Sequence, residues 1–325
     1  MKKASTNTKS INLSVVKRGI LLCGHGSRDK EGIEGFKELV LLLKHRYPDR
    51  IVDYGFLEFS HPVYAAAVER MYLEGVREIT AVPAILFAGG HAKNDIPYEM
   101  NSLQQQYEGL TIKLASHIGI TPSILQLAKK NIEILEAQHP QTDRKETCLL
   151  VVGRGTSDPD ANSDVVKLMR MLWEGMGFGF GTTAYIGVTT PLLKDTLPLL
   201  ERLPFQRVVV LPIFLFTGVL LKRIYEQIDA FNSTSEKEFL YTSSFETDDL
   251  LLEALSERIT EAEKGSPNMN CQLCKYRTQI VGFENEVGKE QVGHHLAVKG
   301  ILFEEDEKIA EKKGILSGVK KILGI

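Results

Sequence analysis

The stretch Gly19–Ser27 reads Gly-Ile-Leu-Leu-Cys-Gly-His-Gly-Ser, an apolar run of strand length that ends in a glycine-rich turn. Further apolar runs, Ile51–Leu57 and Ile79–Ile85, alternate with stretches that show helical spacing, Phe36–Leu43 and Ala65–Leu73. Strands that alternate with helices in this rhythm indicate parallel sheets covered by helices on both faces. The sequence therefore predicts an α/β fold.

The same pattern occurs twice along the chain. His25, between two glycines, corresponds to Arg154, also between two glycines, and the two positions are 129 residues apart. The same offset relates four further pairs: Pro62 and Pro191, Pro83 and Pro212, Leu86-Phe87 and Leu215-Phe216, and Gly89 and Gly218. A period this long indicates a duplicated domain rather than a solenoid repeat. We expect two similar domains at 18–142 and 146–265, a flexible N-terminal segment at 1–17 and a C-terminal tail at 266–325.

The two copies differ at three positions where the first copy carries reactive side chains. The pairs, first copy before second, are His25 and Arg154, Glu58 and Gly187, and His91 and Leu220. The three first-copy residues each follow a predicted strand, and the carboxyl ends of parallel strands meet at one edge of a sheet. We therefore expect these residues to converge in the first domain, with the second domain forming a wall of the cleft.

The three converging side chains have a chemistry in common. Two imidazoles and a carboxylate suit borderline divalent metals such as cobalt, nickel, iron or zinc. Neutral imidazole also accepts protons near pH 7. Structural metal sites use more ligands in a closed shell, so an open site of this kind favours metal delivery. An enzyme that inserts a metal needs both properties, because it must release the metal and remove protons.

Composition argues against several other classes of protein. The 325 residues carry a formal net charge of −3 with a pI near 6.3, so no basic surface for nucleic acid is expected. No apolar stretch is long enough to span a membrane, and the Lys-rich start lacks the features of a signal peptide. Four cysteines do not make a disulfide framework in a chain of this length, which indicates a reducing cytoplasm.

Three short motifs occur in order along the chain. They are Cys23–Arg28 (Cys-Gly-His-Gly-Ser-Arg), Phe56–Glu58 (Phe-Leu-Glu) and Gly90–Pro97 (Gly-His-Ala-Lys-Asn-Asp-Ile-Pro). Together they resemble the sirohydrochlorin cobaltochelatase family, among the class II chelatases. The resemblance implies two flavodoxin-like domains that enclose a tetrapyrrole, and insertion of cobalt(II) into sirohydrochlorin without ATP in the early-cobalt route to cobalamin. It assigns metal binding and proton acceptance to His25 and His91, with assistance from Glu58.

Sirohydrochlorin carries many carboxylates, so the resemblance also implies a cleft with cationic and hydrogen-bond donors. The candidates lie in or beside the motifs at the strand ends: Ser27, Arg28, Lys93, Arg154 and Thr156. For each residue taken singly, a solvated charge or an ordinary helix cap is the alternative explanation.

The tail carries a second candidate metal site. Cys271 and Cys274 lie in a Met-x-Cys-x-x-Cys motif, which has the spacing of soft-metal ligands. Long members of the family carry a similar tail associated with an iron–sulfur cluster, and the resemblance implies such a cluster here. Two cysteines are too few for four ligands, so either His294 and His295 complete the set or two chains share one cluster in a homodimer. A zinc knuckle and an unliganded cysteine pair are the alternatives.

Three other functions fit parts of the pattern. A sirohydrochlorin ferrochelatase would use the same imidazoles for iron. A non-catalytic carrier of metal or tetrapyrrole would hold its cargo at the histidine pair without turnover. A redox protein built around the tail leaves unexplained why the second copy lacks the two histidines and the carboxylate. We expect a cobaltochelatase with sirohydrochlorin and a divalent metal as substrates, and no nucleic-acid or membrane partner.

Overall fold

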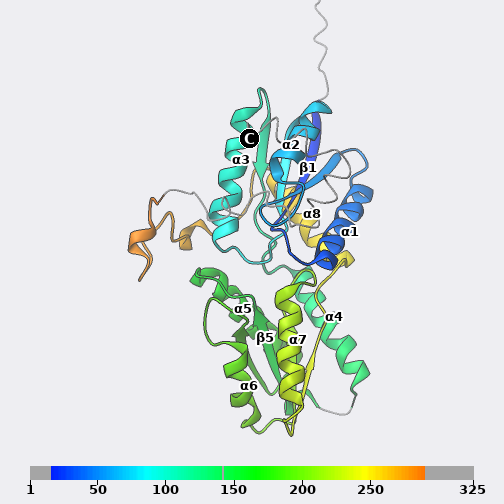
Figure 1. The fold of residues 1–325 in the computed structure, drawn as a ribbon, viewed down its shortest axis with the longest axis vertical. Coiled ribbons are helices and arrows are strands. Elements are labelled where there is room, and N and C mark those ends of the chain that lie inside the picture. The colour runs from blue at the N-terminus through cyan, green and yellow to red at the C-terminus, as the bar shows by residue number, and fades with distance from the viewer. Residues whose placement is uncertain (1–15, 141–142, 290–325) are drawn as a thin grey trace, which may run out of the picture.

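The computed structural model describes residues 16–140 and 143–289, which form two lobes stacked along the long axis of the molecule (Figure 1). Each lobe contains a four-stranded parallel sheet, with strand order β2-β1-β3-β4 in the first and β6-β5-β7-β8 in the second. This order is the beginning of the flavodoxin-like, doubly wound order. The strands are β1 (Lys17–Gly24), β2 (Ile51–Phe56), β3 (Val76–Pro83), β4 (Thr111–Leu114), β5 (Thr147–Gly153), β6 (Phe180–Tyr185), β7 (Arg207–Pro212) and β8 (Glu238–Tyr241).

Helices cover both faces of each sheet, because alternate residues of the central strands are apolar on both sides. In β1, Ile20 and Leu22 face one core, whereas Leu21 and Cys23 face another. Buried strands of parallel sheets are apolar throughout for this reason. The helices of the described residues are α1 (Lys30–Arg46), α2 (Tyr64–Leu73), α3 (Ile96–Gln106), α4 (Pro122–Gln138), α5 (Pro159–Met176), α6 (Leu193–Glu201), α7 (Val219–Asn232) and α8 (Asp249–Glu263). The predicted α/β class with two duplicated flavodoxin-like domains is confirmed.

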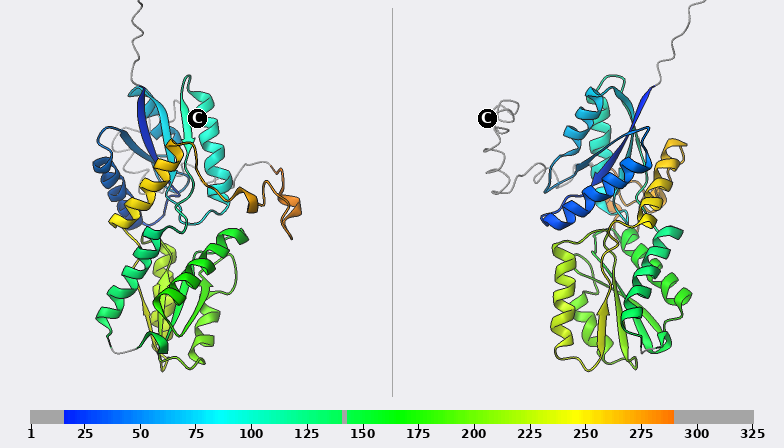
Figure 2. Two further views of the ribbon diagram at one scale, coloured as in Figure 1. Left: turned by 180° about the vertical axis from the view of Figure 1, so that it is seen from behind. Right: turned by 90° about the vertical axis from the view of Figure 1, so that its right-hand side faces the viewer.

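The two lobes exchange their last helices. Helix α8, from the end of the second repeat, packs against β3 and β4 of the first sheet. Its residue Glu263 forms an ion pair with Arg50 of the first repeat, with an N···O distance of 2.6 Å. Helix α4, from the end of the first repeat, packs against β7 and α5 of the second lobe (Figure 2). The two exchanged helices also pack against each other, so one apolar core runs through both lobes. Each lobe therefore combines residues from both sequence repeats.

The described part of the tail lies outside both sheets. It contains two short 3₁₀ turns, Cys271–Leu273 and Glu284–Glu286. Of the predicted N-terminal segment 1–17, only Val16 and Lys17 are described, and Lys17 already belongs to β1. Across 16–140 and 143–289, no helix combines the length and apolarity that crossing a membrane requires.

Candidate functional site

The first histidine lies in a turn that only glycine allows. Gly26 has φ 98°, and a β-carbon there would lie 1.7 Å from the carbonyl oxygen of Glu58. This close approach places the turn after β1 against the turn after β2. The amide of Glu58 donates to the carbonyl of His25 over 3.0 Å, which fixes the two turns together. The backbone therefore brings the His25 and Glu58 side chains to the same sheet edge.

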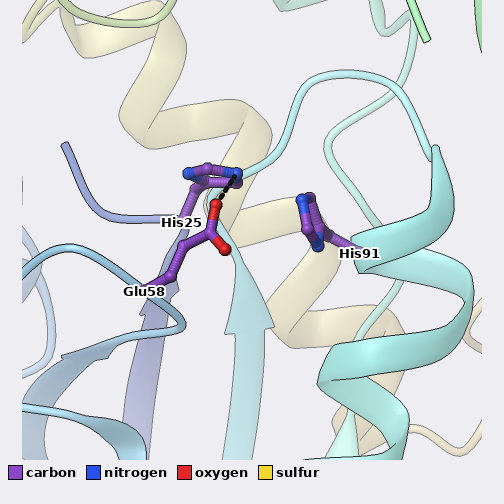
Figure 3. A group of neighbouring side chains, drawn as sticks. All are labelled: His25, Glu58 and His91. Carbon is purple, nitrogen blue, oxygen red and sulfur yellow. Dashed lines mark ion pairs between the residues drawn. The ribbon is translucent and has the colours of Figure 1, made fainter. Parts of the chain in front are cut away.

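The three predicted residues converge in the structure. Nε2 of His25 lies 3.1 Å from Oε1 of Glu58, and the ring centroids of His25 and His91 are 4.7 Å apart (Figure 3). One ligand atom from each residue lies within 4.8 Å of the others. The Glu58 side chain is 3% exposed, whereas those of His91 and His25 are 13% and 28% exposed. The carboxylate is thus buried beneath two imidazoles that are partly exposed.

The tautomer of His25 follows from the group that its Nδ1 contacts. Its Nδ1 lies 3.0 Å from the carbonyl oxygen of Gly26, which only accepts, so Nδ1 carries the hydrogen. Nε2 then faces a carboxylate oxygen and needs a cation between them, either a proton or a metal. The second oxygen of Glu58, Oε2, is buried and accepts no hydrogen bond from any described residue. A buried carboxylate oxygen without a partner is costly, and a metal ion would satisfy it.

His91 is oriented by a carboxylate that sequence reasoning missed. Its Nδ1 donates to Oδ2 of Asp95 over 2.6 Å, and Asn94 donates to the other oxygen of Asp95 over 3.1 Å. Because Asp95 contacts Nδ1, Nε2 of His91 is the nitrogen that can bind a metal, as in other sites where a carboxylate sets the histidine tautomer. The two residues lie in a single π-helical turn, His91–Asp95. Their spacing of four residues is the signal that could have identified the pair.

A cleft of about 560 Å³ lies between the lobes, and His25 and His91 are in its wall. Four of the five predicted substrate-binding residues line it: Ser27, Arg28, Arg154 and Thr156. Large apolar side chains form much of the rest, among them Phe36, Phe59, Phe87, Leu215 and Phe216. The guanidinium groups of Arg28 and Arg154 are on exposed residues, and that of Arg28 lies 4.7 Å from the centre of the Phe59 ring. An apolar cleft with cations at its rim suits a flat, apolar molecule that bears carboxylates.

Lys93 does not fit its predicted role in substrate binding. Its side chain is 1% exposed, and Nζ lies 2.9 Å from both Oδ2 of Asp158 and Oδ2 of Asp160 in the second lobe. Burial opposes the charged form, but the hydrogen bonds to Asp160 and Asp158 outweigh it and raise the pKa of Lys93. The ammonium is therefore already neutralised between the lobes, and the residue does not line the cleft.

The iron–sulfur cluster predicted for the tail is not supported. Cys274 is buried and Cys271 is exposed, and the Sγ of Cys271 accepts a hydrogen bond from Arg277 over 3.0 Å. Within the described ranges, the only group of His, Cys, Asp and Glu side chains that could hold a metal is His25, Glu58 and His91. The two other predicted ligands, His294 and His295, lie outside the described residues.

Comparisons with known proteins agree with the duplication and the fold. A sequence model of the family described as CbiX matches residues 19–135 and again residues 148–262. A sirohydrochlorin cobaltochelatase of Priestia megaterium is 33% identical over 280 residues, which cover 86% of this chain and 88% of that protein. A sirohydrochlorin ferrochelatase of the same species is 29% identical over 241 residues, covering 74% and 88%. The solved structure of SirB from Bacillus subtilis with Fe3+ shares the fold, with a TM-score of 0.69 and 23% identity over 78% of this chain and 100% of that one.

Proposed function

The chain belongs to the CbiX family, and we propose that it is a chelatase that inserts cobalt(II) into sirohydrochlorin without ATP. One observation carries the proposal: His25, Glu58 and His91 converge at an apolar cleft, where a buried oxygen of Glu58 has no partner among the described residues. Three donors without a closed shell suit a metal that is bound and then released.

Binding of the macrocycle divides between the two lobes. The aromatic and aliphatic walls contact the flat ring, and burial of that ring supplies the main gain in free energy. Arg28 from the first lobe and Arg154 from the second pair with peripheral carboxylates, helped by the hydroxyl groups of Ser27 and Thr156. The second lobe thus binds substrate at the position where the first lobe binds metal, because Arg154 replaces His25.

Insertion exchanges one divalent metal for two pyrrole protons. Nε2 of His25, Nε2 of His91 and the Glu58 carboxylate hold the metal next to the ring. As each imidazole releases the metal, its Nε2 can accept a pyrrole proton, because a neutral imidazole nitrogen is a general base. Glu58 stabilises the imidazolium that forms at His25, because its Oε1 already lies 3.1 Å from Nε2. No electron transfer is needed, and no nucleotide takes part.

Cobalt is proposed as the metal, with ferrous iron as the alternative. The cobaltochelatase relative aligns over 86% of this chain, whereas the ferrochelatase relative aligns over 74%. The donor atoms themselves suit both metals. The ratio of insertion rates for the two metals therefore decides between a cobaltochelatase and a ferrochelatase.

The test is the absorbance of sirohydrochlorin over time, without oxygen or ATP, after addition of cobalt(II) or ferrous iron. We expect rapid conversion by the wild type, and a loss of at least about 100-fold in the His25→Ala and His91→Ala variants. His45→Ala is the matched control, because His45 is exposed on α1 and its Nδ1 lies 2.7 Å from the carbonyl oxygen of Leu41 in the same helix.

Two outcomes would contradict the proposal. Conversion by the wild type at the enzyme-free rate, with stoichiometric binding of metal or tetrapyrrole, would make the protein a carrier. Wild-type rates in both histidine variants would show that the metal is inserted elsewhere.

A further inference from the structure

A buried ion pair joins the turn that carries His91 to the second lobe. Lys93 is the third residue of the π-helical turn His91–Asp95. Its Nζ lies 2.9 Å from Asp158, the N-cap residue of helix α5 in the second lobe, and 2.9 Å from Asp160 in the first turn of that helix. The backbone that positions His91 is therefore attached to both lobes.

The duplication provides a second, reciprocal ion pair. Nζ of Lys222 in the second lobe lies 2.8 Å from Oδ2 of Asp29 and 2.8 Å from Oε2 of Glu31. Asp29 is the N-cap residue of helix α1 in the first lobe, and Glu31 lies in the first turn of that helix. Lys222 is the repeat counterpart of Lys93 at the offset of 129, and the two acids correspond to those that Lys93 contacts. The lobes thus meet in a pseudo-twofold manner, in which each repeat sends a lysine to the first helix of the other.

The two ion pairs differ in burial. The Lys93 side chain is 1% exposed, whereas that of its counterpart is 45% exposed. The tail covers the buried pair: Asn270 donates to Asp160 over 3.2 Å, and Lys275 donates to the carbonyl of Ser157 over 3.4 Å. A buried, paired charge is far harder to separate than an exposed one. The two lobes are therefore joined more firmly at Lys93 than at Lys222.

The two lysines also differ in the residue that lies two positions before each of them. Two residues before Lys93 lies His91, a proposed metal ligand, and two residues before Lys222 lies Leu220, which has no metal-binding atom. The same ion pair therefore positions a ligand in one copy and an apolar wall of the cleft in the other.

We propose that Lys93 is a positioning residue for metal insertion: by pairing with Asp158 and Asp160, it fastens the His91 turn to the second lobe and keeps His91 beside His25 and Glu58. The inference rests on the proposed chelatase function. Lys93 touches neither metal nor macrocycle, so it acts only through the position of His91. Lys222 makes the equivalent pair without positioning a ligand, which makes it the internal control.

The first experiment compares Lys93→Met with Lys222→Met. Two quantities are measured: the rate of cobalt insertion into sirohydrochlorin, and the visible spectrum of cobalt(II) bound to the protein without tetrapyrrole. We expect Lys93→Met to slow insertion about 10- to 100-fold and to weaken the protein-bound cobalt band, as loss of a group that orients a ligand does. We expect Lys222→Met to change both by less than about twofold, because exposed ion pairs contribute little. Equal losses in both variants would overturn the proposal.

A second variant separates positioning from stability. Lys93→Met alone leaves buried carboxylates without a cation, so it lowers the unfolding midpoint whatever its role. The triple variant Lys93→Met, Asp158→Asn, Asp160→Asn removes these charges, and asparagine keeps the cap of α5. We expect the triple variant to recover the wild-type midpoint while its insertion rate and cobalt spectrum stay impaired.

Recovery of both stability and the cobalt spectrum in the triple variant would show that Lys93 only neutralises buried charge, and would overturn the proposal. If Lys93→Met does not fold, the triple variant is compared with the wild type directly. If the wild type does not convert sirohydrochlorin, the proposed function fails, but the cobalt spectra of the variants still decide whether Lys93 positions His91.

Discussion

The two repeats build the same sheet-edge turns and fill them with different chemistry. Gly26 and Gly155 both have positive φ, 98° and 83°, and a β-carbon on either would lie within 2 Å of a carbonyl oxygen, at 1.7 Å and 1.9 Å. The non-glycine residues Phe59 and Val188 share a second unusual conformation, with φ of 58° and 66°. Features that both copies keep are therefore those that the doubly wound fold demands.

The side chains that differ are those of the site. The first copy carries His25, Glu58, His91 and Asp95, and the second carries Arg154, Gly187, Leu220 and Ile224 at the same positions. No position in the second set can bind a divalent metal with an imidazole or a carboxylate. Under the proposed function, the first copy would therefore supply the metal site and the second would supply only part of the substrate cleft.

The largest effect is expected at Glu58. Glu58→Gln keeps the shape of the side chain but removes the charge that holds the metal and stabilises imidazolium, so we expect cobalt insertion to fall at least about 100-fold. The same change should lower the unfolding midpoint only slightly, because Oε2 of Glu58 has no partner among the described residues and Oε1 lies beside the partly exposed imidazole of His25. Gly187→Gln places the same side chain in the second copy, where a β-carbon meets nothing within 4 Å, and should leave the rate unchanged. Equal losses of activity in both variants would remove the distinction between the copies.

The shared glycines should respond alike. Gly26→Ala and Gly155→Ala each force a β-carbon into a carbonyl oxygen in a left-handed conformation, so we expect each to lower the free energy of unfolding by about 2–4 kcal/mol. Denaturant unfolding measures both. A tolerated Gly155→Ala beside a damaging Gly26→Ala would mean that this turn serves the metal site rather than the fold.

Much of this arrangement was predictable from the sequence. The constant offset of 129 revealed the duplication, and the rule that parallel strands end at one edge predicted the convergence of His25, Glu58 and His91. That convergence depends only on which strand each residue follows, and the strands can be recognised from the residues next to each site residue.

The features that could not be predicted from the sequence depend on contacts between residues far apart in the chain. Lys93 was expected at the rim, but the acids that neutralise it lie 65 and 67 positions away in the other repeat. The exchange of α4 and α8 was not predicted, because an amphipathic helix carries no mark of which sheet its apolar face will cover. The spacing of apolar residues shows that one face of each helix is buried, but it does not show which of the two sheets covers that face.

Asp95 separates orientation of a ligand from ligation itself. Asp95→Asn leaves His91 in place but allows the amide to donate to Nδ1, which would turn the ring hydrogen toward the metal side. We therefore expect about a 10- to 50-fold loss in cobalt insertion, smaller than for Glu58→Gln. Its counterpart, Ile224, is buried in the second core, and Ile224→Val should leave the rate unchanged while slightly lowering stability. A loss in Asp95→Asn as large as in His91→Ala would mean that the tautomer of His91 matters as much for insertion as the imidazole itself, so that orientation and ligation cannot be separated at this residue.

The smallest effect concerns the pH dependence of stability, at a position where the copies also differ. Burial lowers the pKa of His117 to about 4, helped by the positive charges of Arg258 and Lys93. The folded pKa is below the unfolded value, so stability is complete above about pH 6.5 and is lost as the pH falls toward 4. Between pH 7 and 5 we expect His117 to lower the free energy of unfolding by about 1–2 kcal/mol.

Replacing His117 isolates this contribution. His117→Gln should flatten the fall in the free energy of unfolding between pH 7 and 5, whereas His45→Gln, at an exposed histidine, should leave it unchanged. In the structure the second copy has Ser244 in the corresponding place, because the amides of Ile118 and Phe245, the next residues, donate to the equivalent carbonyls of Ile85 and Phe214. This serine is buried and does not titrate in this range. Acid sensitivity should therefore come from the first repeat, the one that carries the metal site. An unchanged pH slope in His117→Gln would show that protonation of other groups destabilises the fold, and the two repeats would then be alike in this respect.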